Sequence, residues 1–193
     1  MACTALTKGR GLDCNRISGG IKYVYFGVYD TVTDIEYDTL NPQILDAMDL
    51  NTEPLYRYTM PLGVASVTDT ITGSRENGTI FNTPSVNIIL NRLTKEDQNE
   101  IKLLSQTKVI IFAQLNSKLA NGHDEIIALG TVNGMELNAG TMDSGSDFGS
   151  RQGYTLTFDG LEPVPFKFVE DYTTTPFDNA GFTNPATPVV DPS

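Results

Sequence analysis

The sequence is short of the residues on which most catalytic and metal sites depend. It has one histidine and two cysteines in 193 residues, and charged residues make up only 19%. Two cysteines without clustered histidines are too few for a zinc site. No run of about 18 apolar residues occurs, so we expect no transmembrane helix. The N-terminal sequence MACTALTKGRGLDC lacks the apolar stretch of a secretory signal. We therefore expect folding in a cytoplasm, with Cys3 and Cys14 as free thiols and a disulfide between them as the alternative.

Basic residues are also scarce. The chain has 13 Lys and Arg against 24 Asp and Glu, which gives a net charge of −11 and a pI near 4.4. A chain this acidic has few Lys and Arg side chains with which to displace the counterions of nucleic-acid phosphates. Binding of nucleic acid by the chain as a whole is therefore not expected. An acidic surface would instead let DNA pass without adhering to it.

The residues that are present favour a mainly β fold with many turns. Gly and Pro are abundant, and short stretches alternate between apolar and polar residues. Residues 32–37 are expected to pair with 21–29 as a hairpin. The expected strands are 21–29, 32–37, 55–60, 63–72, 79–90, 109–115, 125–131, 132–137, 153–158 and 164–169.

Two of these strands alternate between two faces. In 63–72 one face carries Val64, Ser66, Thr68 and Thr70, and the other carries Ala65, Val67, Asp69 and Ile71. In 153–158 the two faces carry Tyr154, Leu156 and Phe158 against Thr155 and Thr157. The dipeptide Asn-Gly at 77–78 predicts a hairpin that joins 63–72 to 79–90. Two strands of this length can project well beyond a compact domain.

One segment reads as a helix. Thr94 and Asp97 resemble a capping box, and acidic residues near the start with lysines near the end complement the helix dipole. Its apolar side is Ile101 and Leu104, with Leu103 at the margin. We expect that side to cover the open face of a sheet, and exposed leucines there would form a docking surface.

The remaining stretches are expected to be irregular. Residues 39–54 read as an acidic loop with a possible helical turn at 43–48, and 138–152 as a loop rich in Gly, Ser and Asp. The predicted organisation is an N-terminal arm (1–20), one domain (21–169) and a C-terminal tail (170–193). The tail is proline-rich and is expected to contribute few core residues and to be ordered only by a partner.

For each candidate catalytic or binding residue, a purely structural role is the stronger prediction. His123 lies in a turn with no converging partners and is expected to be solvated. Asp143 and Asp147, with Ser144 and Ser146, could suggest calcium, but the glutamate that completes an EF-hand loop is missing. The glycines at 9–11 and 19–20 do not connect a strand to a helix, as a phosphate loop would require. The pattern Gly-x-Ser-x-Gly is absent.

Two further groups read as structural. Asp34 and Glu36 share one face of a predicted strand; an exposed acidic face is the expected role, with acid-base chemistry as the alternative. Tyr23, Tyr25 and Tyr29 are predicted to share a face with Phe26 on the other; core or subunit packing is the expected role, with carbohydrate stacking as the alternative. We therefore expect no enzyme, no catalytic residues, no metal and no cofactor.

Two features of the sequence resemble a known family. One is the order of elements over 21–169: a long hairpin, strand–helix–strand, a large Gly/Ser/Asp loop and the closing strands GYTLTFDGLEPVPFKFV. The other is the glycine-rich start MACTALTKGRGLDCNRISGGIKYVYFGVY. Together they resemble tail tube and neck-tail ring proteins of tailed phages, in particular crAss-like and related phages of Bacteroidetes or marine bacteria. The proline-rich C-terminus departs from a typical tube subunit.

The resemblance implies a tail-tube-like β-sandwich or barrel with one flanking helix, a long hairpin and extended arms. It implies a virion protein, assembled in the bacterial host cytoplasm, that forms a homo-oligomeric ring of six or twelve copies around a DNA channel. Adjacent portal, ring or tail proteins would be its partners. Asp34, Glu36, Asp38 and Asp69 are candidates to face the channel, and the polar side of the helix would face outward. The alternative is a monomeric β-sandwich module that binds carbohydrate or peptide as a fibre or decoration component, through exposed tyrosines and residues 138–152.

Overall fold

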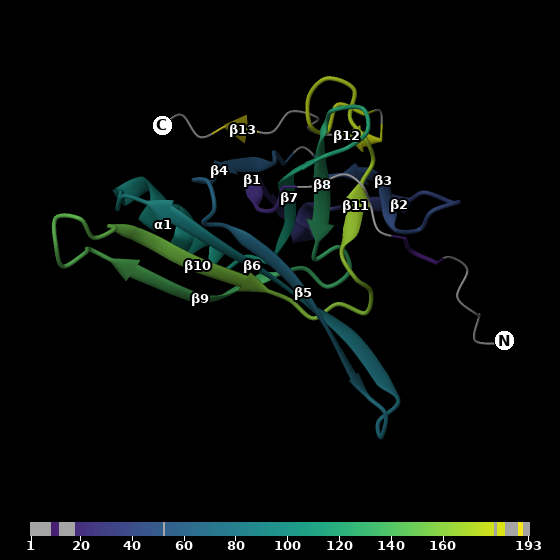
Figure 1. Ribbon diagram of the computed structural model, residues 1–193, viewed down its shortest axis with the longest axis horizontal. Coiled ribbons are helices and arrows are strands. Elements are labelled where there is room, and N and C mark those ends of the chain that lie inside the picture. The colour runs from purple at the N-terminus through teal and green to yellow at the C-terminus, as the bar shows by residue number, and fades with distance from the viewer. Residues whose placement is uncertain (1–8, 12–17, 52, 180, 184–188, 191–193) are drawn as a thin grey trace.

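The computed structural model describes residues 9–11, 18–51, 53–179, 181–183 and 189–190 (Figure 1). Of these, 49% lie in strands and 8% in helices, so the predicted mainly β fold with one α-helix is confirmed. The helices are η1 (Tyr29–Thr31) and α1 (Lys95–Leu104). The strands are β1 (Ile21–Val28), β2 (Asp34–Tyr37), β3 (Ile44–Asp49), β4 (Tyr56–Thr59), β5 (Ser66–Ser74), β6 (Thr79–Asn91), β7 (Val109–Lys118), β8 (Asp124–Leu129), β9 (Glu136–Asp143), β10 (Gly153–Asp159), β11 (Lys167–Val169), β12 (Phe182–Thr183) and β13 (Val189–Val190).

The strands form two sheets. The larger has the order β12-β3-β11-β8-β7-β1-β4-β13, with β2 also paired to β3, and the smaller has the order β5-β6-β10-β9. The far end of the β5–β6 hairpin extends away from the rest of the molecule, as predicted (Figure 1). Gly78 at its turn has a φ of 63°, a left-handed conformation that favours glycine.

The large sheet is apolar on both faces. In β7, the side chains of Val109, Ile111 and Ala113 join a core shared with the small sheet, whereas Ile110 and Phe112 join a second core on the opposite face. A strand buried on both sides reads as a continuous apolar run instead of an alternating one, as VIIFA does.

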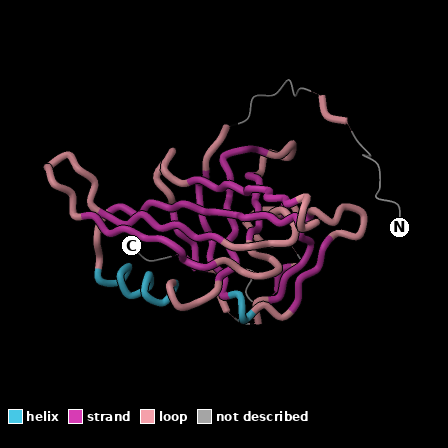
Figure 2. The backbone as a smooth tube through the Cα atoms, turned by 90° about the horizontal axis from the view of Figure 1, so that it is seen from below, coloured by secondary structure: helices cyan, strands magenta, loops and turns pink. Residues whose placement is uncertain are grey.

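Helix α1 has the predicted position and cap. Thr94 Oγ1 accepts a hydrogen bond from the Asp97 N–H at 3.0 Å. Ile101 is buried in the core between the sheets and Leu104 packs against that core, while Leu103 is 50% exposed. Figure 2 shows the helix along one side of the strands.

The region after β1 differs from the prediction. Strand β2 pairs with β3 and not with β1, because both edges of β1 are already occupied by β4 and β7. Residues 44–49 are a strand instead of a loop or helical turn. Leu45 and Met48 are buried in the second core, although the aspartates around them mask the apolar pattern in the sequence.

The region after β8 differs as well. The chain leaves the large sheet at Leu129, turns through Gly130 and Gly134, which both have left-handed φ values, and enters the small sheet as β9. Strand β9 continues to Asp143, so the loop predicted from residue 138 begins only after that residue.

The C-terminal segment was expected to contribute few core residues, and this is wrong for its described part. Phe177 is 1% exposed and Phe182 is 4% exposed, and both belong to the second core. The ring of Phe177 packs edge-on against Tyr25 and Phe112, with centroid distances of 5.1 Å in both cases. Strand β12 also pairs with β3. Phe177 and Phe182 therefore cover the outer face of the large sheet within the same chain.

Candidate functional site

The open face of the small sheet is lined by hydroxyl and amide side chains. Strand side chains alternate, and Val86, Ile88, Leu156 and Phe158 are buried on the core side. The residues between them point the other way. We call this surface the open face; its hydroxyl- and amide-bearing residues are Ser66, Thr68, Thr70, Thr83, Ser85, Asn87, Thr141, Thr155 and Thr157, and none of them is buried.

The strand register arranges these residues in rows across the sheet. Ser66 lies opposite Asn87, and Asn87 lies opposite Thr157. The Asn87 side-chain amide donates to Thr157 Oγ1 at 3.5 Å. Asn87 and Thr157 therefore partly satisfy one another. The same register places Ile89 opposite Thr155 and Asp159 opposite Ser85, so the face also carries an apolar and an acidic side chain.

The charge on this surface is neutral to acidic. None of the four strands contains a Lys or Arg. Asp159 and Glu136 lie opposite each other at one end, and Asp143 lies at the other. Arg151, in the loop before β10, donates from Nη2 to Thr155 Oγ1 at 2.7 Å. The strands of this face therefore offer no cations with which to neutralise phosphates.

The small sheet has two free edges among the described residues. Strand β5 pairs only with β6, and β9 pairs only with β10. Free edges present N–H and C=O groups that a strand from another chain can pair with. Because β5 and β9 are different strands, such pairing would join one end of a copy to the other end of the next.

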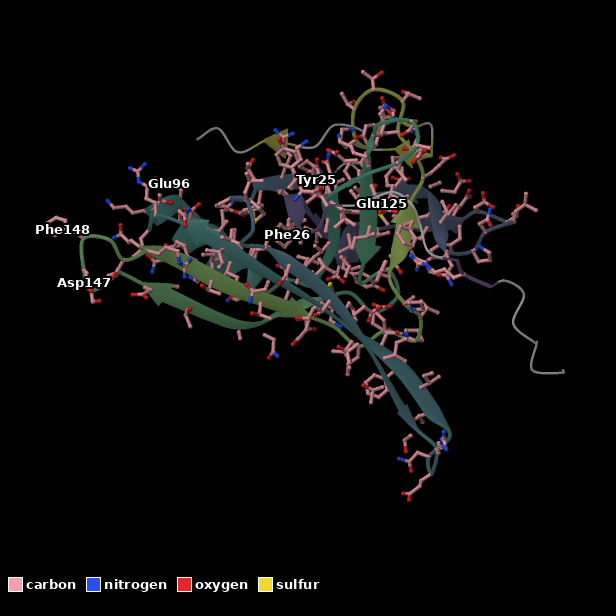
Figure 3. The ribbon with its side chains drawn as sticks, in the orientation of Figure 1. Tyr25, Phe26, Glu96, Glu125, Asp147 and Phe148 are labelled. Atoms are coloured by element: carbon pink, nitrogen blue, oxygen red, sulfur yellow. The ribbon has the colours of Figure 1, made fainter. Side chains whose placement is uncertain are left out.

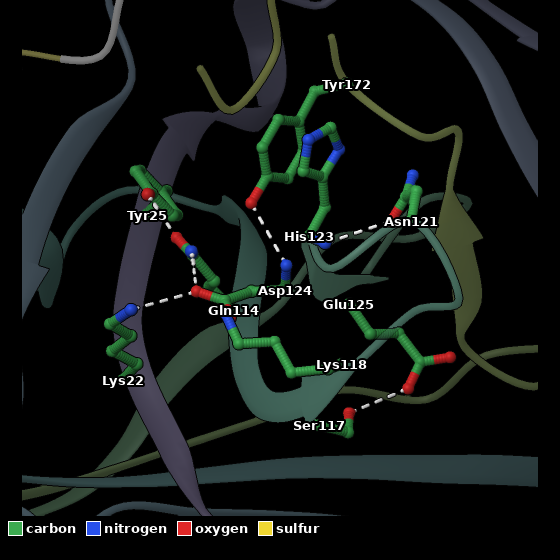
Figure 4. A network of polar contacts seen from close by, with 10 residues as sticks. All are labelled: Lys22, Tyr25, Gln114, Ser117, Lys118, Asn121, His123, Asp124, Glu125 and Tyr172. Atoms are coloured by element: carbon green, nitrogen blue, oxygen red, sulfur yellow. Dashed lines mark hydrogen bonds and ion pairs between the residues drawn. The ribbon is translucent and has the colours of Figure 1, made fainter. Parts of the chain in front are cut away.

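A buried polar network lies within the large sheet, centred on Asp124 at the start of β8 (Figure 4). Its Oδ2 accepts hydrogen bonds from Lys22 Nζ at 3.0 Å and from Gln114 Nε2 at 2.7 Å, and Lys118 Nζ contacts Oδ1. The Tyr25 hydroxyl donates to Gln114 Oε1 at 2.7 Å. The network therefore connects β1, β7 and β8.

The two acidic groups of this network stay in one protonation state near neutral pH. Burial raises the pKa of Asp124, but hydrogen bonds from Lys118, Lys22 and Gln114 lower it more, to about 2. Burial raises the pKa of Tyr25 to about 12. A general acid or base needs a pKa near the working pH, so these groups suit a structural brace and not proton transfer.

The same network holds the C-terminal segment. The Asp124 N–H donates to the Tyr172 hydroxyl at 3.1 Å, and Asn121 Nδ2 donates to Asp171 Oδ2 at 2.9 Å. The His123 ring stacks on Tyr172 with centroids 4.5 Å apart. His123 was expected to be a solvated turn residue; it is instead half-buried against the C-terminal segment.

A second buried carboxylate shapes the crossing between the sheets. Glu162 is 4% exposed and accepts from the N–H groups of Val132 at 3.2 Å and Asn133 at 2.9 Å. Burial raises the pKa of Glu162, and hydrogen bonds from the backbone of Asn133, Val132 and Gly134 lower it in part.

Asp69, a candidate to face the channel, is turned toward the other side of its strand. Its Oδ2 accepts from the Phe166 N–H at 3.2 Å. Asp69 therefore lies on the core side of β5 and not on the open face.

The other acidic candidates for a channel lie away from the small sheet. Asp34 and Glu36 are exposed on β2 in the large sheet. Asp38 Oδ1 accepts from the N–H groups of Leu40 at 2.6 Å and Asn41 at 2.8 Å, so it caps the turn before β3. None of these three residues belongs to the open face.

The calcium candidates do not converge. Asp143 Oδ1 accepts from the Gly145 N–H at 2.9 Å, and Ser146 Oγ approaches Asp147 at 3.4 Å. In the described part of the chain, no group of three or more His, Cys, Asp or Glu residues could hold a metal ion. Cys3 and Cys14 lie outside the described residues.

The aromatic residues of β1 lie on the two faces of the strand as predicted, with the exception of Tyr29. Tyr23 and Tyr25 face the second core and Phe26 faces the first. Tyr29 leaves the strand and lies in η1 instead. Tyr25 is fully buried and Arg57 lies over the Tyr23 ring at 4.8 Å. Packing, and not an exposed stacking platform, is the role that the structure gives to Tyr25.

Sequence reasoning missed the Asp124 network and Glu162. A signal for the first was available, because Gln114 is a polar residue that directly follows the apolar run VIIFA. A buried glutamine needs partners for its amide, but the sequence does not say which residues supply them. Glu162 gave no signal, because it stands in a turn-like stretch between Leu161 and Pro163.

Comparison with known proteins gives no family assignment. In the described part of the chain, the only α-helix has ten residues and is too short and too polar to cross a membrane. No protein-family model, no curated protein and no solved structure matches this chain.

Proposed function

We propose that this protein is a non-enzymatic structural subunit of a phage virion that forms a ring or tube segment around the DNA channel of a tail or neck. The observation that supports the proposal most directly is the open face. It is broad, polar, uncharged at its centre and free of Lys and Arg within its strands. Such a surface hydrates well, and its strands offer DNA phosphates no cation to bind, which suits a channel wall. Arg151, in the loop before β10, is a cation that contacts this face, through Thr155.

The free edges of the same sheet supply a way to close the ring. Pairing of β9 in one copy with β5 in the next would extend the small sheet from subunit to subunit. The contact is heterologous, and a heterologous contact closes into a ring when its rotation divides a full turn. Six or twelve copies would then enclose the channel, with the open faces directed inward.

The remaining parts have roles consistent with this assembly. The projecting end of the β5–β6 hairpin carries exposed Ile71 and Ile80, at 68% and 71% exposure. Apolar residues on a projecting arm suit contact with an adjacent ring, portal or tail protein. The polar side of α1 would face outward, as the resemblance to tail tube proteins implies.

The proposal is tested by electron microscopy of the purified protein. Closed rings with a central hole are expected. In a Cys3→Ser, Cys14→Ser background, a gold label on Thr157→Cys should appear inside the hole, and a label on Glu96→Cys at the outer rim. A strictly monomeric particle at high concentration, with neighbouring virion proteins present, would refute the proposal, as would label from Thr157→Cys at the rim.

One observation favours the alternative of a carbohydrate- or peptide-binding module. Phe148 is fully exposed at the tip of the β9–β10 loop, where an aromatic ring could stack on a sugar. A monomer that binds glycans on an array, and loses binding on Phe148→Ala, would support this alternative against the ring.

A further inference from the structure

An apolar pocket opens between α1 and the large sheet. It has a volume of about 240 Å³, and its apolar lining includes Phe26, Tyr56, Tyr58, Leu103 and Leu104. Tyr56 is 41% exposed and Leu103 is 50% exposed. An apolar cavity of roughly 150 Å³ is large enough to take up benzene, so this pocket has room for one phenyl ring.

The chain also carries a fully exposed phenyl ring. Phe148 stands at the tip of the loop between β9 and β10, where its side chain points away from the body (Figure 3). Hydrogen bonds within the loop hold its shape: the Gly145 N–H donates to Asp143 Oδ1 at 2.9 Å, and the Ser150 N–H donates to the Asp147 carbonyl at 2.9 Å. The ring is therefore presented on a structured loop.

The charges around the two features are complementary. Asp147 directly precedes Phe148 in the loop, whereas Lys102 adjoins Leu103 on the exposed side of α1. Asp147 of one copy can meet Lys102 of the next, whereas Arg151 is already hydrogen-bonded to Tyr154 and Thr155 of its own chain. Among the described residues, none of the salt bridges involves Asp147 or Lys102.

We propose that Phe148 of one copy inserts into the pocket beside α1 of the next copy. The contact would be a second interface within the proposed ring, and its biological role rests on the proposed function. It is heterologous, since the loop and the pocket are different parts of the chain. A buried aromatic anchor in a pocket is the usual form of an energetic hot spot, and here it would add to the pairing of sheet edges.

Cysteine cross-linking tests the contact directly. In a Cys3→Ser, Cys14→Ser background, Phe148→Cys protein is mixed with Leu103→Cys protein under mild oxidation. We expect a disulfide-linked heterodimer that identifies both residues by peptide mapping. The matched control is Leu40→Cys mixed with Leu103→Cys, because Leu40 is 87% exposed on the turn after β2; it should give no more product than random collision.

Self-association measured by analytical ultracentrifugation supplies the second readout. Phe148→Asp should weaken association of the full chain by about tenfold or more, and Leu40→Asp should leave it unchanged. Equal association of wild type and Phe148→Asp, with no specific cross-link, would overturn the contact even if rings are seen by microscopy. A specific cross-link and weakened association without closed rings would support the contact while refuting the proposed ring.

Discussion

Replacement of Asp124 by Asn tests whether the buried network is the brace that its geometry indicates. The Asp124 side chain is 5% exposed and is contacted by Lys22, Lys118 and Gln114. Its pKa is about 2 against a usual 3.8. At about 1.4 kcal/mol per pKa unit, the ionised carboxylate stabilises the folded chain by roughly 2 kcal/mol at neutral pH. The Asp124→Asn substitution removes this contribution, while Lys22 and Lys118 are about half exposed and stay solvated, so we expect a loss of about 2 kcal/mol.

The sign of the pH dependence follows from the lowered pKa. A carboxyl whose pKa is depressed on folding contributes its full stabilisation above its unfolded-state pKa and loses it as the pH falls through the folded-state value. The contribution of Asp124 should therefore be complete at about pH 7, roughly halved at about pH 3 and absent below about pH 2.

Urea denaturation followed by circular dichroism at several pH values measures this. The difference in free energy of unfolding between wild type and Asp124→Asn should shrink as the pH falls below about 4. Glu136→Gln is the matched control, because the Lys108–Glu136 pair is exposed on both sides and its loss should cost less than about 1 kcal/mol. A deficit for Asp124→Asn that is as small as the control, or that does not change with pH, would refute the reasoning.

Three further substitutions test other parts of the fold by the same denaturation assay. Phe177→Ala should cost about 3–5 kcal/mol, because its buried ring packs against Tyr25 and Phe112; a loss below about 1 kcal/mol would contradict a place for the C-terminal segment in the core. Thr94→Ala should cost about 1 kcal/mol by removing the α1 cap, and Thr94→Ser should restore most of it. Gly78→Ala should cost about 1–2 kcal/mol, because its φ of 63° is left-handed; no loss would show that the turn can rearrange.

Local patterns were sufficient for the elements whose signals are complete within a few residues. The cap at Thr94, the turn at Asn77-Gly78 and the alternation in β1 and β10 each depend on neighbours in the chain, and each was predicted. Strand β3 was not, because two of its partners, β11 and β12, come from a distant part of the sequence, and its aspartates hide the buried Leu45 and Met48.

The sequence by itself determined the fold class, the helix, the projecting hairpin and the two faces of β5 and β10, because side-chain alternation and turn chemistry are local properties. It also determined the scarcity of basic residues that the proposed channel requires. Only the tertiary structure decided that the chain leaves the large sheet after β8 and enters the small sheet as β9, that Asp124 meets two lysines, and that Phe177 and Phe182 complete a core. Those outcomes depend on which distant segments pair and on how closely they pack, and a linear pattern does not encode either.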